Sequence, residues 1–195
     1  MISKDERVHY QRKLRPYFMT SVCILAGSGL LGAVAKAYAP DTSQYFDQNI
    51  AEFVRLFRAL PKLELAGAIF LNNTLKALFV LLGGIALGIL PVIFIFANGA
   101  AVGFVLYGSI ESRGLLTALL AILPHGIFEL PAVLLATSMG LLLGRSSIKK
   151  LFGGGETTIS GELALALKFF VKIVVPLLFI AALVEAFVTS VLVKG

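Results

Sequence analysis

The sequence predicts an all-α fold, a polytopic membrane helical bundle with five transmembrane spans, an interrupted fourth span and an amphipathic helix on the membrane surface. Hydrophobic residues make up 58% of the 195 residues and charged residues 14%. Soluble domains are about half apolar, so the excess apolar surface indicates lipid as the solvent. The positive charges of the chain, whose net charge is +6, lie at the edges of the apolar blocks. We therefore treat residues 1–195 as a single membrane domain.

The first span is expected at about 17–39. Its apolar stretch is longer than the core of a secretory signal, and Pro40 would follow the cleavage-like Ala37-Tyr38-Ala39, so a transmembrane helix is favoured. Pairs of small residues four positions apart, such as Ser28 and Gly32, predict close helix packing in lipid.

An amphipathic surface helix is expected at 43–60. Its apolar residues recur at intervals of three or four, and Pro61 ends it. These residues are Phe46, Ile50, Phe53, Phe57 and Leu60. The helix has two interpretations, packing on the other spans or docking a partner protein.

The second and third spans come from one apolar block, residues 66–110. As a single helix this block would be roughly 68 Å long, about twice the hydrocarbon thickness of a bilayer. A tight hairpin near 88–91 is therefore predicted, with spans at about 66–88 and 91–110.

The fourth and fifth spans are expected at about 115–144 and 167–193, joined by a polar segment at 145–162. The fourth block would be roughly 45 Å long as a straight helix, more than a bilayer needs. Pro124 and Pro131 lie inside it, so we expect this span to be broken or strongly kinked.

The basic residues predict the orientation. Residues 1–16 and 145–172 together hold ten Lys and Arg, whereas the segments expected on the other side hold six, diluted by acidic residues. The positive-inside rule then places the N-terminus in the cytoplasm and the C-terminus outside the cell membrane.

Seven polar residues remain inside the predicted spans. They are Asn72, Asn73, Lys76, Asn98, His125, Glu129 and Glu185. A charge at the centre of a span costs about 2.5–3.5 kcal/mol even on insertion scales, so each of these residues should face protein, water or a partner. Counted from the span ends, Lys76, Asn98, His125, Glu129 and Glu185 fall at similar depths, which predicts one shared polar layer.

His125 and Glu129 are four residues apart and hence on one face of a continuous helix. Pro124 suits the first position of a half-helix, whose positive end would then favour the Glu129 carboxylate or a bound anion. Gly126 permits a close backbone approach beside His125. Lys76 is the expected counter-charge for Glu129 or Glu185.

This layer has several interpretations. It is a proton or ion relay with Glu129 titrating, a metal site built on His125 and Glu129, or a satisfied polar cluster that fixes the packing of the helices. The sequence contains no HExxH, GxSxG or paired-aspartate motif, so we expect no enzyme. No metal site, cofactor or nucleic-acid partner is predicted.

The run Pro124-His125-Gly126-Ile127-Phe128-Glu129-Leu130-Pro131-Ala132 resembles the signature of the stage II sporulation protein M family. The upstream pattern Asn72-Asn73, Gly83-Gly84, Gly88, Pro91 and Asn98-Gly99 resembles that family too, and the likeness covers residues 10–193. The resemblance implies a membrane-embedded scaffold without catalysis of its own. In spore-forming bacteria the namesake works with peptidoglycan-degrading partners.

Two functions are therefore expected. The first is a non-enzymatic scaffold that recruits other proteins of a membrane complex within the lipid bilayer. The alternative is a transporter or channel for protons, ions or a small anion that uses His125 and Glu129. The small-residue faces also favour a homodimer.

Overall fold

A computed structural model describes residues 4–38, 60–154 and 158–189 of the chain, apart from the side chains at 4, 5, 121, 122, 125 and 189. The predicted surface helix at 43–60 lies outside these residues except for its last position. Every regular element among the described residues is helical. The bounds are α1 Lys4–Tyr38, α3 Lys62–Gly83, α4 Ile89–Arg113, α5 Leu115–Leu151, and a last run made of α6 Ile159–Phe169, η1 Phe170–Val174, α7 Val175–Val184 and η2 Glu185–Thr189. Five helices are long and apolar enough to cross a membrane, which confirms the predicted fold class.

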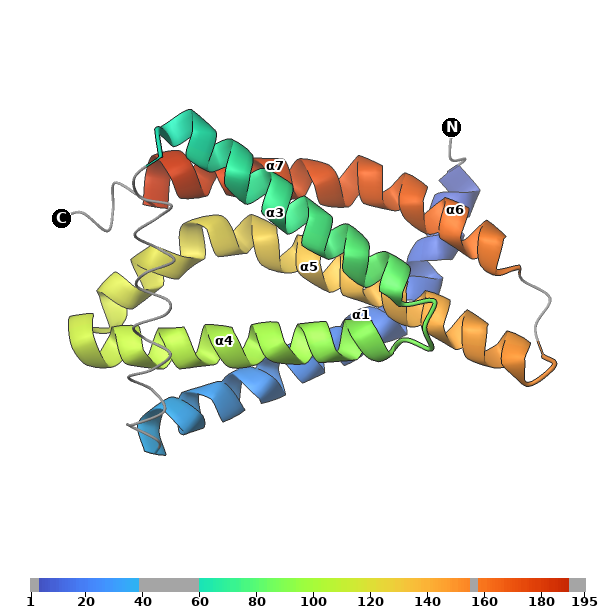
Figure 1. Ribbon diagram of the computed structural model, residues 1–195, viewed down its shortest axis with the longest axis horizontal. Helices are drawn as coiled ribbons and strands as arrows, with labels where there is room; N and C mark the ends of the chain where they lie inside the picture. Colours follow the sequence, from blue (N-terminus) through green and yellow to red (C-terminus); the bar gives the residue numbers. More distant parts are fainter. Residues whose placement is uncertain (1–3, 39–59, 155–157, 190–195) are drawn as a thin grey trace.

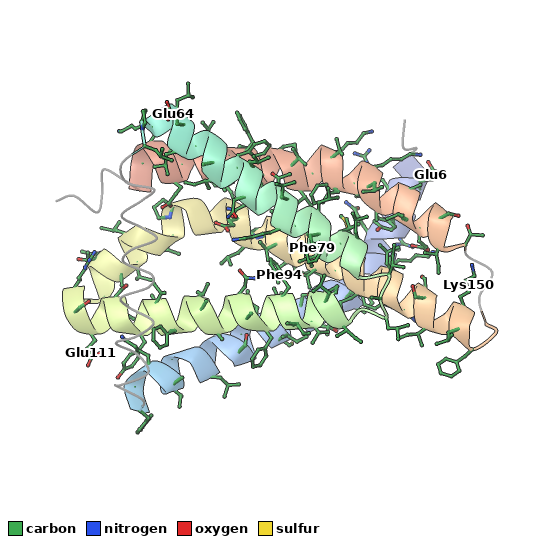
Figure 2. The ribbon with its side chains drawn as sticks, viewed as in Figure 1. Glu6, Glu64, Phe79, Phe94, Glu111 and Lys150 are labelled. Atoms are coloured by element: carbon green, nitrogen blue, oxygen red, sulfur yellow. The ribbon has the colours of Figure 1, made fainter. Side chains whose placement is uncertain are left out.

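Helix α5 lies at the centre of the bundle. Figure 1 shows α1 and α4 on one side of it and α3 and α7 on the other. We call the end that carries Glu6 and Lys150 the basic end, because most of the Lys and Arg side chains gather there, and the end that carries Glu64 and Glu111 the opposite end (Figure 2).

Helices α3 and α4 are joined at the basic end by a turn over residues 84–88. The turn comes four residues before the predicted hairpin at 88–91. Leu87 and Gly88 have φ of 57° and 75°, the left-handed conformation that reverses the chain. Pro91 lies in the first turn of α4, where its missing N–H breaks no helical hydrogen bond. Proline thus begins the helix and does not belong to the turn, which explains the misplaced boundary.

The predicted interruption of the fourth span is wrong in one respect. Helix α5 runs from Leu115 to Leu151 with Pro124 and Pro131 inside it, so it is not divided into two half-helices. Figure 1 shows it bent in its first half instead. A proline removes one hydrogen bond and pushes against the preceding turn, and a helix in a bundle can absorb this by bending. No helix N-terminus lies at Pro124, and the positive helix end expected there is absent.

Three helices extend further at the basic end than predicted. Helix α1 begins at Lys4 instead of about 17, α5 continues to Leu151, and the last run begins at Ile159 instead of about 167. Tyr10 and Leu14 are buried, and the rings of Tyr10 and Phe169 pack with their centroids 4.7 Å apart. The extended helix ends therefore pack on one another and belong to the main hydrophobic core of the bundle.

Glycine residues set the closest helix contacts. A Cβ atom on Gly103 of α4 would overlap the Gly29 carbonyl of α1, and one on Gly32 would overlap the Ala100 carbonyl. Likewise, a Cβ on Gly144 of α5 would overlap the backbone at Gly88. The small residues of the first span therefore pack within the chain, and the homodimer remains a prediction without that support.

Candidate polar site within the bundle

The centre of the candidate site is a chain of two hydrogen bonds between α3 and α5. The Asn73 amide Nδ2 donates to Glu129 Oε1 at 3.2 Å, and the Asn72 amide Nδ2 donates to Asn73 Oδ1 at 3.2 Å. All three side chains are half-buried. The structure thus brings together three of the seven predicted residues, and the Asn73 amide donates to the carboxylate.

Toward the basic end, the layer beneath this cluster is closely packed. Leu81 of α3 and Ala136 and Met139 of α5 have no exposed surface. A Cβ atom on Gly140 would lie against the Val80 carbonyl and the Pro91 ring. The buried Ser138 hydroxyl donates to a carbonyl of its own helix, that of Leu134. The polar cluster is therefore separated from the basic end by packed side chains and backbone.

Lys76 does not join the cluster. Its side chain is exposed and forms no ion pair or hydrogen bond with any described residue, so the expected pairing with Glu129 or Glu185 is not formed. The reason is the rotation of α3. Asn73 occupies the position that faces α5, and Lys76, three residues later, is turned by about 60° around the helix axis.

Glu185 lies nearer the opposite end than the cluster does. The rings of Phe70 and Phe179 meet at 5.5 Å, and Lys62 Nζ lies 5.7 Å from the ring centroid of Phe187. These contacts are eight residues apart on both helices, so the antiparallel register is constant between them. By this register Glu185 is level with the first turn of α3, about 13 Å from the level of Asn73. Helix η2, which begins at Glu185, contacts α3 and α5.

The remaining predicted residues lie on two helices, Asn98 on α4 and Pro124, His125, Gly126 and Pro131 on α5. The Asn98 amide donates to the Phe94 carbonyl at 2.9 Å, a hydrogen bond within α4. The backbone of His125 is helical and part of α5, whereas its side chain lies outside the described residues. Pro124 is half-buried and Gly126 is buried, both at the bend.

A second group of polar contacts, at the basic end, was missed by the sequence reasoning. Lys13 Nζ lies 2.6 Å from Glu162 Oε1, and the Glu162 side chain is only 6% exposed. Arg145 donates to the Tyr17 hydroxyl at 2.8 Å. The sequence signal was the single acid, Glu162, at the start of an otherwise apolar run. Both contacts join α1 to helices more than a hundred residues away.

Among the described residues, no group of three or more His, Cys, Asp or Glu side chains is placed to hold a metal ion. An apolar groove of about 360 Å³ runs between α1 and α4, lined by residues that include Gly29, Leu30 and Val102. The Asn72–Asn73–Glu129 cluster supplies hydrogen-bond donors and one carboxylate between two helices. Chemically, it suits helix association or the binding of a proton.

The helices, their length and their interior polar contacts define a multi-pass helical membrane protein. The sequence profile of the stage II sporulation protein M family matches residues 18–190, and the chain therefore belongs to that family. This confirms the resemblance read from the Pro124–Ala132 run. An uncharacterised protein of the archaeon Methanocaldococcus jannaschii is 36% identical over 155 residues, which is 75% of this chain and 80% of the relative. No solved structure matches the chain.

Proposed function

We propose that this protein is a non-enzymatic scaffold that recruits other membrane proteins. The observation that carries the proposal is the packing around Glu129. Its carboxylate accepts a hydrogen bond from Asn73, and the layer toward the basic end consists of buried side chains and glycine contacts with the backbone. A half-buried amide–carboxylate pair of this kind fixes the rotation of two helices against each other. A conduction path would need water to pass the layer in which Leu81, Ala136 and Met139 have no exposed surface.

The orientation belongs to the same proposal. The basic end lies on the cytoplasmic side of a cell membrane, because Lys and Arg near span ends are retained on that side. Lys149 and Lys150 end α5 there, whereas Glu64 and Glu111 lie at the opposite end (Figure 2). In a Cys23→Ser background, an impermeant maleimide added to intact cells should label Ser112→Cys and spare Lys150→Cys. The reverse pattern would invert the orientation.

Ion flux tests the proposal against its alternative, a transporter or channel. The purified chain is placed in liposomes with a pH-sensitive dye inside, and a proton gradient is applied with the membrane potential clamped. We expect the gradient to decay as in empty liposomes, for the wild type and for Glu129→Gln alike. Gln keeps an acceptor oxygen for Asn73, so this variant should fold.

Proton flux in the wild type that is lost in Glu129→Gln would overturn the scaffold proposal. A second variant, Asn73→Ala, serves as the matched control. It removes the donor from the same hydrogen bond but leaves the titratable group in place. Loss of flux in Glu129→Gln with flux retained in Asn73→Ala would identify Glu129 as a conducting group.

A further inference from the structure

Lys76 is the starting point, because it is a charged residue well inside a membrane span. Seven residues separate it from Gly83 at the basic end of α3 and fourteen from Lys62 at the other, roughly 10 and 21 Å along the axis. Its side chain is exposed, and it pairs with no described residue. A lysine in this position costs about 2.5–3.5 kcal/mol on the insertion scale, so a partner group for it is expected.

Helix geometry shows which side of α3 carries Lys76. Gly83 lies two turns further along the same face, and a Cβ atom on it would meet the side chain of Leu90 in α4. Lys76 therefore lies on the side of α3 that faces α4. Figure 1 shows these two helices meeting at the turn and diverging toward the opposite end.

The facing side of α4 is uncovered as well. Ala97 lies seven residues after Leu90 and hence on the same face, with Ala101 one turn further. Both alanines are exposed, which is incompatible with α3 packing on them. Two small residues four positions apart are the pattern that allows another helix to approach closely in lipid. The facing sides of the two helices thus expose a cation on α3 and a small-residue face on α4.

We propose that a transmembrane helix of a partner protein docks between α3 and α4 and places an Asp or Glu side chain against Lys76. This inference rests on the proposed scaffold function and names the kind of partner that the scaffold receives. The carboxylate of the partner removes the cost of the unpaired charge, and the face of Ala97 and Ala101 gives close packing beside it.

Charge complementarity favours this occupant over a second copy of the chain. Within the membrane-crossing parts that the structure describes, the carboxylate away from the helix ends is Glu129, and it is half-buried within the bundle, as is Glu185 nearer the opposite end. A second copy therefore offers Lys76 no exposed acid at this depth.

The depth of Lys76 also argues against a lipid phosphate. Side chains on a helix lean toward its N-terminus, which for α3 is the opposite end, so Lys76 is directed away from the nearer surface. Exposed apolar side chains, Phe79, Leu82 and Ile85, lie between it and the basic end. A lipid headgroup would have to descend past them, whereas a helix carries its own acid to this level.

The experiment uses the full chain in phosphatidylcholine liposomes, with a donor fluorophore on Cys23, the chain's single cysteine, which is exposed. The probes are acceptor-labelled Leu/Ala model helices with Glu, Gln or Leu at the central position. Energy transfer should show that the Glu helix binds at least ten times more tightly than the Gln helix. Lys76→Gln should abolish this preference, and Lys76→Arg should keep it.

Two controls make the result specific. Lys172→Gln removes an exposed lysine of the last run that lies at about the depth of Lys76 by the register of that run against α3, and it should leave the preference unchanged. Lys76→Glu should reverse the preference toward a model helix with a central Lys. Equal binding of the Glu and Gln helices by the wild type, or an unchanged preference in Lys76→Gln, would overturn the inference.

A third set of measurements, with anionic lipid, distinguishes a carboxylate on a helix from a lipid phosphate as the partner of Lys76. If the preference for Glu disappears when part of the phosphatidylcholine is replaced by phosphatidylglycerol, Lys76 binds headgroups and the inference is overturned. A result that overturns the docking inference can also be told apart from one that overturns the scaffold proposal. Absence of a Glu preference leaves the scaffold standing, whereas proton flux through Glu129 ends the scaffold proposal whatever the model helices do.

Discussion

Helix α4 meets two of its neighbours, α1 and α3, in opposite ways. It packs against α1 at glycine contacts, with Gly99 and Gly103 set against the backbone of Leu25 and Gly29. It meets α3 at the turn, through Gly83 and Leu90, and the two helices then part (Figure 1). The difference follows from residue size and charge. Glycines at four-residue spacing let two backbones touch, whereas a lysine on the facing side of α3 keeps that face open.

The largest expected effect comes from breaking the α1–α4 contact. In Gly103→Ala the new Cβ would overlap the Gly29 carbonyl, so the helices must separate along their whole contact. We expect a loss of about 2–3 kcal/mol of unfolding free energy, because the clash is with backbone, which cannot move aside as a side chain does. Thermal or denaturant unfolding in detergent measures it.

Gly27→Ala is the matched control for that change. A Cβ atom at Gly27 meets nothing within 4 Å, and the residue is an exposed helix position. The same substitution should raise stability by about 0.5–1 kcal/mol through helix propensity alone. Equal effects at the two glycines would contradict the α1–α4 packing described above.

An intermediate effect is expected at the single close contact between α3 and α4. In Gly83→Ala the Cβ would meet the side chain of Leu90, which can change rotamer at about 1 kcal/mol. The higher helix propensity of Ala stabilises the helix by a similar amount. The free energy of unfolding should therefore change by less than about 1 kcal/mol in either direction. A loss as large as that of Gly103→Ala would mean that the turn, and not the α1 contact, organises α4.

The smallest effect is expected on the open face of α4. Ala101→Leu adds a larger apolar side chain at an exposed position and should change the unfolding free energy by less than about 0.5 kcal/mol. The same variant should weaken docking of the Glu model helix, because it blocks close approach. A strong loss of stability in Ala101→Leu would show that α3 covers this face after all.

Most of the fold could be predicted because lipid imposes a simple rule. Apolar blocks of the right length must be helices, and the five blocks are where the helices lie. The extension of α1 to Lys4 could not be predicted, since Tyr10 and Leu14 are two apolar residues among charges and become buried through contacts with the last run. The turn was misplaced because Pro91 was assigned to the turn, although proline also suits the start of a helix.

The sequence predicted that polar side chains meet inside the bundle, but it predicted only some of the residues that meet. Counting residues from span ends gives depth, and it put Lys76 and Glu129 in one layer, one turn from the Asn73 that contacts Glu129. It does not give the rotation of a helix about its own axis, and that rotation decides that Asn73 and not Lys76 meets Glu129. Depth counting also failed for Glu185, because the register of the last run against α3 is set by contacts of Phe179 and Phe187, which put Glu185 level with the first turn of α3.

The ion pair at the basic end has a consequence for how the protein is made. Lys13 emerges from the ribosome early, and its partner Glu162 follows 149 residues later. The first helix therefore inserts before the acid that neutralises its lysine exists, and contacts of such long separation form late. The N-terminal segment is thus held in its final place only when the last span arrives. A nascent chain arrested before that point would present Lys13 without the acid that neutralises it in the folded protein.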